Sequence, residues 1–203
     1  MKLWKKMLLS CVDLLKSNTK YLCELDSIAG DGDHGVTMGR IASCIENRIY
    51  NHEENDFIKK INEDLSMDLM NVNGGSAGPL YGTIFEGMGE GIEEKESLST
   101  QEVKNMFKES KEAFKIISKA KLGDKTLVDA FYPAVDAIVN SQGGLVEIIE
   151  AGAKAAEEGA ENTKNYIAKF GRAKNVGDRS IGHKDPGAVS ISLFFKGLYE
   201  GAK

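Results

Sequence analysis

The chain has 203 residues, and its 26 Lys and Arg against 31 Asp and Glu give a formal net charge of -5. The sequence pI is about 5.4. This acidic balance argues against binding to DNA or RNA, because nucleic-acid phosphates call for a surplus of basic side chains. No apolar run approaches the roughly 20 residues that cross a bilayer. A chain of this length can bury a core of its own, so we expect one soluble domain over residues 1–203, with no membrane association.

The first ten residues combine lysines with apolar side chains, as a secretion signal does. Asp13 and Lys16 interrupt the apolar stretch early, and no small-residue cleavage site follows. We therefore interpret this segment as the first helix. The 3 cysteines are an odd number without a C-x-x-C pair, which favours neither a disulfide framework nor a zinc knuckle. A cytoplasmic location fits this pattern.

Apolar residues recur three and four positions apart along most of the chain, a spacing typical of amphipathic helices. One helix has a capping-box signal, because Glu102 follows Ser99 at the required distance. We expect about eight helices, in an all-α fold. Those with the clearest patterns are predicted, in chain order, at 4–15, 58–69, 99–121, 128–139, 145–159 and 187–200.

Glycine makes up 22 residues, about a tenth of the chain, above the usual share of ~7%. The glycines gather in four clusters between the predicted helices, at 30–35, 74–82, 123–126 and 171–187. Because glycine destabilises helix interiors and lets the backbone approach a ligand closely, the clusters indicate a binding site. Ordinary helix C-caps remain the alternative for any single glycine.

The first cluster is acidic, with Asp26, Asp31 and Asp33 within eight residues. Like charges ~4 Å apart repel by about 4 kcal/mol at an effective dielectric of 20. An ordered loop of this kind therefore favours a bound cation, and oxygen ligands alone favour magnesium, manganese or calcium over zinc. A solvated acidic turn is the alternative.

Three nucleotide and metal motifs are excluded. Residues 30–35 match G-x-G-x-x-G, but no strand precedes them and their aspartates would repel a bare pyrophosphate. An EF-hand starting at Asp31 would have Ala42 where the bidentate acid belongs. No P-loop occurs either, because Ser118 stands where the first glycine of that motif would precede 123–126.

The later clusters supply groups that suit an anion. Residues 73–80 place bare amides and the Ser76 hydroxyl just before a helix, and helix N-termini favour phosphate. The 171–187 cluster adds Arg172 and His183. A nucleotide that a divalent metal joins to the acidic loop is the simplest ligand for both charge signs. His34 and His183 could equally be structural hydrogen-bonding residues.

Taken together, these motifs resemble the nucleotide-binding L subunits of dihydroxyacetone kinases. The matching segments are 30–35 (GDGDHG), 73–82 (NGGSAGPLYG), 123–126 (GDKT), 171–173 (GRA) and 185–187 (DPG), in the order that the family has. They span nearly the whole chain. Ala77 is a departure, because many members have serine at that position.

The resemblance implies an antiparallel, up-and-down eight-helix barrel with the nucleotide site at one end. It implies that Asp26, Asp31 and Asp33 hold two Mg²⁺ ions, and that these aspartates act in catalysis together with Arg172. The nucleotide contacts that it implies are His34, Gly35, Val36, Thr37, Gly75, Ser76, Gly123, Tyr132, Arg172, Asp185, Pro186 and Gly187.

The resemblance also implies partners. Bound ADP would be phosphorylated by a phosphohistidine on an M-type subunit of the phosphotransferase system. The ATP so formed would pass its phosphoryl group to dihydroxyacetone on a K subunit. Two alternatives stay open, an ATP-dependent kinase subunit for another short ketose such as erythrulose and a nucleotide-sensing regulator that catalyses no transfer. A homodimer is also open.

Overall fold

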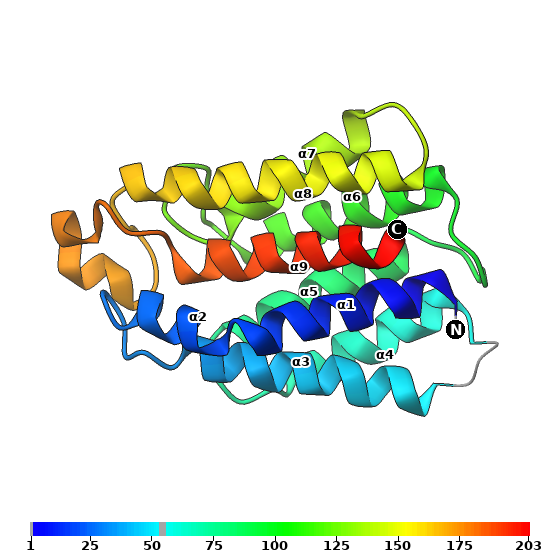
Figure 1. Ribbon diagram of the computed structural model, residues 1–203, viewed down its shortest axis with the longest axis horizontal. Helices are drawn as coiled ribbons and strands as arrows, with labels where there is room; N and C mark the ends of the chain where they lie inside the picture. Colours follow the sequence, from blue (N-terminus) through cyan, green and yellow to red (C-terminus); the bar gives the residue numbers. More distant parts are fainter. Residues whose placement is uncertain (1, 53–55) are drawn as a thin grey trace.

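The computed structural model describes residues 2–52 and 56–203, and in these residues it is all-α, as predicted (Figure 1). Within these two described ranges there are nine α-helices, two 3₁₀ segments and no strand. The helices are α1 (Leu3–Ser17), α2 (Thr19–Asp26), α3 (His34–Asn51), α4 (Ile58–Met70), α5 (Ala77–Glu90), α6 (Thr100–Ile117), α7 (Val128–Asn140), α8 (Leu145–Asn162) and α9 (Pro186–Ala202). The 3₁₀ segments, η1 (Thr163–Asn165) and η2 (Arg172–Ser180), both lie between α8 and α9.

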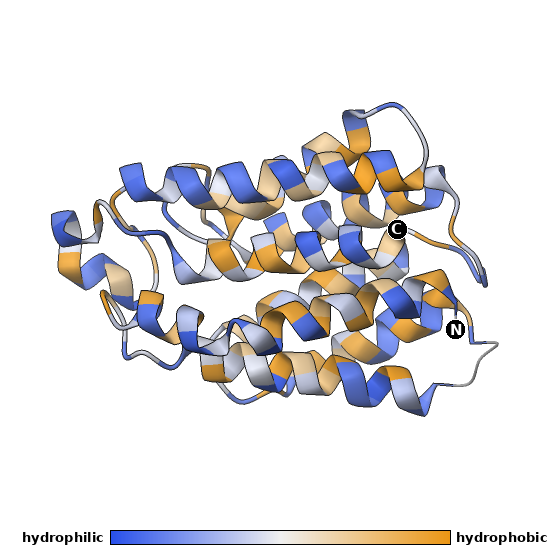
Figure 2. Cartoon of the chain, viewed as in Figure 1, coloured by the Kyte–Doolittle hydropathy of each residue, from blue (hydrophilic) through white to orange (hydrophobic). Residues whose placement is uncertain are grey.

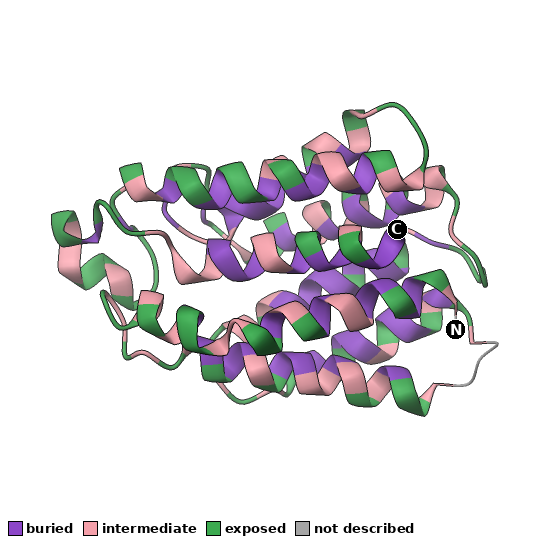
Figure 3. Ribbon diagram, viewed as in Figure 1, coloured by how far each residue is buried: buried purple, intermediate pink, exposed green. Residues whose placement is uncertain are grey.

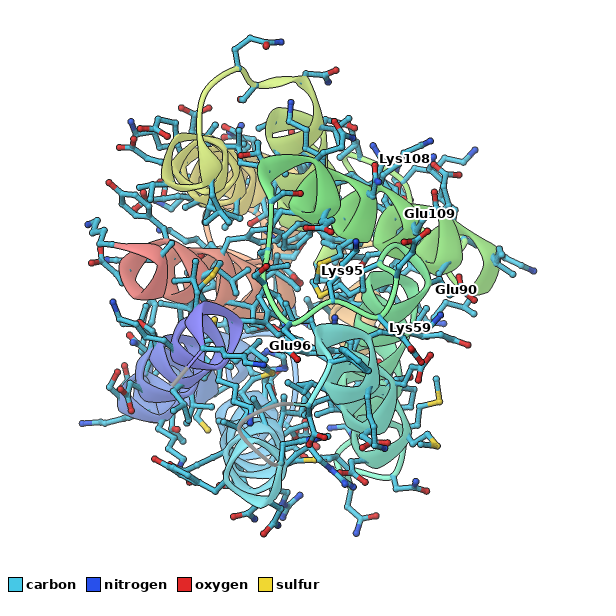
Figure 4. All side chains as sticks on the ribbon, turned by 90° about the vertical axis from the view of Figure 1, so that its right-hand side faces the viewer. Lys59, Glu90, Lys95, Glu96, Lys108 and Glu109 are labelled. Carbon is cyan, nitrogen blue, oxygen red and sulfur yellow. The ribbon has the colours of Figure 1, made fainter. Side chains whose placement is uncertain are left out.

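Eight of the helices form a closed ring. Each packs on the next in the order α1, α3, α4, α5, α6, α7, α8 and α9, and α9 packs back on α1. The short α2 extends α1 beyond a bend at Asn18, and it packs on α3. Figure 4 looks along the ring from the end that carries both termini, where its labelled lysines and glutamates mix both charge signs. The predicted up-and-down barrel of eight helices is therefore confirmed, with α2 as an additional short helix.

The apolar stripes of the helices meet inside the ring and bury one hydrophobic core (Figures 2 and 3). Aromatic rings of three helices meet there, with Phe131 of α7 5.4 Å from Phe114 of α6 and 6.4 Å from Phe195 of α9 between ring centroids. The predicted capping box begins α6, where the Glu102 amide donates to Ser99 Oγ over 3.2 Å. None of the described helices combines the length and the apolar character that a membrane crossing requires.

Close packing of α9 on α1 closes the ring and depends on two glycines of α9. A Cβ atom on Gly197 would lie 2.4 Å from the Cα atom of Cys11, and one on Gly201 would lie 2.5 Å from the Cα atom of Met7. These are backbone atoms of α1, which cannot move aside as a flexible side chain could. Any side chain at either position must therefore push the two helices apart.

The topology explains why the glycine clusters come together. Because successive ring helices run in opposite directions, every second connection falls at the same end of the barrel. The connections at residues 27–33, 71–76, 118–127 and 163–185 meet at the end away from the termini (Figure 1). These segments contain the clusters, three of which continue into the first residues of the following helix, α3, α5 or α9.

Gly197→Ala should destabilise the protein by about 1–3 kcal/mol, because the added methyl group overpacks the contact between α9 and α1. Gly39→Ala is the matched control. The nearest atom to a Cβ at Gly39 is Thr19 Oγ1 at 3.8 Å, so alanine fits and should stabilise α3 by about 0.5–1 kcal/mol. Urea denaturation followed by circular dichroism measures both changes. Equal effects of the two substitutions would contradict this account of ring closure.

Candidate functional site

A cavity of about 440 Å³ opens where the four connections meet. Each of these connections contributes side chains to its wall, as do the first turns of α3, α5, α7 and α9. The predicted site residues that line it are Asp26, Asp31, Asp33, His34, Thr37, Gly75, Ser76, Arg172, Asp185, Pro186 and Gly187.

The three aspartates converge on one side of this cavity. Each offers one carboxylate oxygen, and these oxygens lie within 4.8 Å of one another. Asp26 Oδ2 accepts hydrogen bonds from the amides of Asp33 (3.0 Å) and His34 (3.2 Å), so it caps the start of α3. A Cβ atom on Gly30 would lie 2.3 Å from Asp26 Oδ1, so the turn requires glycine there.

Oxygen atoms alone make up this cluster, and Asp31 and Asp33 are exposed. Hard divalent cations such as Mg²⁺ prefer such ligands and keep several waters. The geometry therefore fits a metal ion that shares its coordination shell with another ligand in the cavity. The guanidinium of Arg172 forms an ion pair with Asp31, which joins the acidic loop to the connection between α8 and α9.

The N-terminus of α5 also opens into the cavity. Gly75, at φ 65°, and Ser76 lead into the helix, and both line the wall. The first amides of a helix have no intrahelical acceptor, and they can bind an anion. Gly74 packs so tightly on Thr37 of α3 that a Cβ atom would lie 2.2 Å from Thr37 Oγ1. This contact fixes the α5 N-terminus against the start of α3.

The start of α9 forms another part of the wall, where half-buried Asp185 lies, and half-buried His34 of α3 reaches α9. Asp185 caps α9 by accepting from the Ala188 amide over 2.7 Å, and burial raises the pKa of Asp185 to about 7 although that hydrogen bond opposes the shift. His34 Nε2 lies 3.1 Å from Ser190 Oγ. Burial lowers the pKa of His34, against the effect of the Asp26 carboxylate.

The connection between α6 and α7 is organised by Asp129. Its carboxylate accepts from the amides of Gly123 (2.5 Å) and Thr126 (2.8 Å). Between them lies Lys125, which has a left-handed backbone with φ 58° and a buried side chain that reaches the cavity wall. The Lys125 ammonium donates to the carbonyl oxygens of Thr163 and His183, each over 2.5 Å.

Four residues that the resemblance implied do not line the cavity. Gly35 packs on α2, where a Cβ atom would lie 1.9 Å from the Thr19 carbonyl oxygen, and Val36 is 45% exposed. The Gly123 amide is already bonded to Asp129. Tyr132 is buried, with its ring against those of Phe114 and Phe131. Ligand contacts by these four residues stay a prediction.

Sequence reasoning missed the apolar part of the wall and its lysine. Leu80, Leu127, Val128 and Phe170 line the cavity. The first three sit at or beside helix starts, where their spacing resembles that of ordinary core residues. Lys125 lies inside the GDKT segment, and only the glycine of that segment was singled out as a contact. The sequence feature that could have indicated Lys125 is the presence of a lysine directly inside this glycine-containing turn.

Comparison with known proteins gives consistent matches. Residues 28–200 match the DAK2 domain family. The chain is 34% identical over 95% of its length to the ADP-binding subunit DhaL of the PEP-dependent dihydroxyacetone kinase of Escherichia coli, covering 93% of that protein. It is also 34% identical to the ADP-binding subunit DhaL of the PTS-dependent dihydroxyacetone kinase of Lactococcus lactis, over 92% of this chain and 90% of that one.

A solved structure shares the fold. This is the crystal structure of the dihydroxyacetone kinase from C. freundii in complex with AMP-PNP and Mg²⁺, with a TM-score of 0.71 and 24% identity. The match covers 97% of this chain but 33% of that one, so the present chain corresponds to about a third of that kinase.

Fold and site together define an all-helical barrel with an acidic, glycine-rich cavity at one end. With the family match extending over residues 28–200, the chain belongs to the DAK2 domain family. Within that family, the relatives that it matches over most of both lengths are ADP-binding subunits.

The raised pKa of Asp185 predicts a pH dependence of stability. Between about pH 4 and 7 the folded protein holds a proton on Asp185 that the unfolded chain releases, so stability falls as the pH rises through this range. Asp185→Asn keeps an N-cap and removes the titration. Relative to the unsubstituted protein, its free energy of unfolding should rise by about 2–3 kcal/mol from pH 5 to pH 8.

Urea denaturation at pH 5, 6, 7 and 8 without nucleotide measures this change. Asp124→Asn is the control, because the hydrogen bond from Lys169 lowers the pKa of Asp124 and places its titration below this range. The stability of that variant relative to the unsubstituted protein should stay constant over the same pH values. A constant difference for Asp185→Asn as well would show that Asp185 does not titrate as described.

Proposed function

We propose that the chain is the nucleotide-binding, phosphoryl-transferring subunit of a dihydroxyacetone kinase, with ADP or ATP bound in the cavity at the loop end. The observation that carries this proposal is the meeting of Asp26, Asp31 and Asp33 with Ser76 and Arg172 around one cavity. Carboxylates suit metal ions, while an arginine and a helix N-terminus suit phosphate groups. A nucleotide diphosphate with a divalent metal ion uses both.

The three aspartates are the residues that would hold Mg²⁺, as one ion or as the two that the resemblance implies. When bound, Mg²⁺ offsets the negative charge of the phosphate oxygens, which is the main requirement of a loose phosphoryl-transfer transition state. Asp26 contributes a carboxylate whose direction is already fixed by two backbone amides. Asp31 and Asp33 are exposed, so they can turn toward an ion with little loss of packing.

The remaining residues would bind and orient the nucleotide. Arg172 is 63% exposed in its side chain and held by Asp31 alone among the described ion pairs, so it can turn to phosphate when a metal ion occupies the aspartates. The amides at the start of α5 would bind a second phosphate. Leu80, Leu127, Val128 and Phe170 offer an apolar surface for the base.

The partners are proposed from the relatives. Both subunits reported above are named as ADP-binding subunits of PEP-dependent or PTS-dependent kinases, and the chain covers about nine tenths of each. This supports a relay in which a phosphohistidine of an M-type phosphotransferase-system subunit phosphorylates bound ADP. A K subunit would hold dihydroxyacetone as the acceptor. Reconstitution with both partners tests this relay, and turnover sustained by ATP alone would favour a direct ATP-dependent kinase.

Asp31→Asn should lower the affinity for ADP in the presence of Mg²⁺ by about tenfold or more, because one metal ligand is lost. Isothermal titration calorimetry with and without Mg²⁺ measures this. Asp13→Asn removes the same charge from an exposed position on α1 and should bind ADP unchanged. Unchanged Mg²⁺-dependent binding by Asp31→Asn would exclude this residue as a metal ligand.

Arg172→Gln should have opposite effects on the affinity for a metal ion alone and on the affinity for ADP. Removing the cation that pairs with Asp31 should tighten the binding of Mn²⁺ alone a few-fold, while ADP affinity falls by about tenfold with the loss of a charged phosphate contact. Electron paramagnetic resonance follows free Mn²⁺, and calorimetry follows ADP. Arg179→Gln removes the same charge from an exposed position on η2 and should change neither. Weaker binding of both Mn²⁺ and ADP by Arg172→Gln would refute the proposal that Arg172 leaves Asp31 and turns to phosphate when a metal ion binds.

A further inference from the structure

The connection between α8 and α9, residues 163–185, is much longer than the loops of two to eight residues usual between bundle helices. We call it the strap. It carries Phe170, Gly171, Arg172 and Ala173 to the cavity wall. In Figure 1 it projects beyond the ends of the other helices, coloured orange. Its position therefore decides whether Arg172 reaches the site.

The two ends of the strap are joined to each other. The Asp185 amide donates to Thr163 Oγ1 over 2.9 Å, and the Gly182 amide donates to the Lys164 carbonyl oxygen over 2.8 Å. Thr163 is fully buried. These bonds form a neck from which the rest of the strap extends.

Lys125 reaches this neck from a third segment, the connection between α6 and α7. Its ammonium donates over 2.5 Å to the carbonyl oxygen of Thr163 at one end of the strap and over 2.5 Å to that of His183 near the other. One cation thus binds both sides of the neck. Both acceptors are main-chain atoms, so these two bonds of Lys125 do not depend on the identity of the strap's side chains.

The backbone conformation and the burial of Lys125 both cost free energy, which indicates that this side chain has a specific role. Lys125 is the one residue other than glycine with positive φ in the part of the chain that the structure describes, a backbone that disfavours side chains. The residue as a whole is 4% exposed. Burial lowers the pKa of the Lys125 ammonium, although the carboxylates of Asp185 and Asp129 favour its charged form. Glycine would suit this backbone better, so the side chain itself has a use.

We propose that Lys125 is a positioning residue that fixes the neck of the strap and thereby holds Arg172 over the cavity, which slows release of the bound ligand. The identity of that ligand rests on the proposed function, whereas the fixing of the neck does not. Lys125 acts through the main chain of the strap and need not touch the nucleotide.

Trypsin tests the neck without any ligand, because the part of the strap beyond the neck contains Lys169, Arg172, Lys174 and Arg179 as cleavage sites. Lys125→Met keeps the length of the side chain and removes its donors. We expect cleavage after Arg172, Lys174 and Arg179 to be about tenfold faster in this variant, measured by mass spectrometry, with unchanged helix content. Lys169→Met, which removes the exposed lysine of the ion pair between the strap and Asp124, should change these rates less than twofold.

A second experiment measures the dissociation of fluorescently labelled ADP, in the presence of Mg²⁺, by stopped flow. Lys125→Met should release it about tenfold faster, and Lys125→Arg, which restores a cation, should recover part of the difference. If the unsubstituted protein binds no ADP, the proposed function fails while the trypsin result still decides the role of Lys125.

Equal cleavage and release rates for Lys125→Met and the unsubstituted protein would overturn the proposal. If Lys125→Met does not fold, Thr163→Val removes a different bond of the neck, the one that the Asp185 amide donates to Thr163 Oγ1, and the same two measurements apply. Strap cleavage unchanged by that variant would also overturn it.

Discussion

Closure of the helix ring by α1 and α9 is the constraint on which the rest of the structure depends. The first and last helices of the chain contact through Gly197 and Gly201, which let the two backbones approach without intervening side chains. Closure buries the apolar stripes of all eight ring helices in one core. It also gives the barrel two definite ends, so that alternate connections meet at one of them.

The site end concentrates charged groups with very different surroundings. Asp31, Asp33 and Arg172 are exposed, where water screens their charges and where ion pairs contribute little stability. Lys125 and Asp185 lie deeper, where burial shifts both pKa values toward the neutral form. The exposed groups are therefore free to exchange partners, whereas the deeper ones hold fixed hydrogen bonds to the backbone.

Local patterns in the sequence predicted much of this arrangement. Helix periodicity and the capping box depend on residues within one or two turns, and the aspartates are close in sequence, so both could be inferred from short segments. The resemblance supplied the order of the helices around the ring.

What the sequence could not provide was contact between distant segments. The bonds of Lys125 join positions 38 and 58 residues apart in the chain. The burial of Tyr132 against the aromatic rings of Phe114 and Phe131 likewise depends on helix packing. A motif match shows only that the same residue type occurs at the position of a ligand contact. It does not record whether a backbone amide, as at Gly123, is already engaged within its own turn.

The division between exchangeable and fixed groups is consistent with the proposed relay, in which the nucleotide would stay bound while phosphoryl groups are transferred. Arg172 comes from the strap, whereas the aspartates come from the end of α2 and the connection that follows it, and the ion pair of Arg172 with Asp31 already joins these two segments. An exposed pair of this kind contributes roughly 0–1 kcal/mol, so a metal ion and a phosphate can replace it at little cost. The buried neck at Lys125 binds main-chain carbonyls that no ligand replaces. If Lys125 fixes the neck as proposed, the strap can stay in place while the groups that it presents to the cavity change partners.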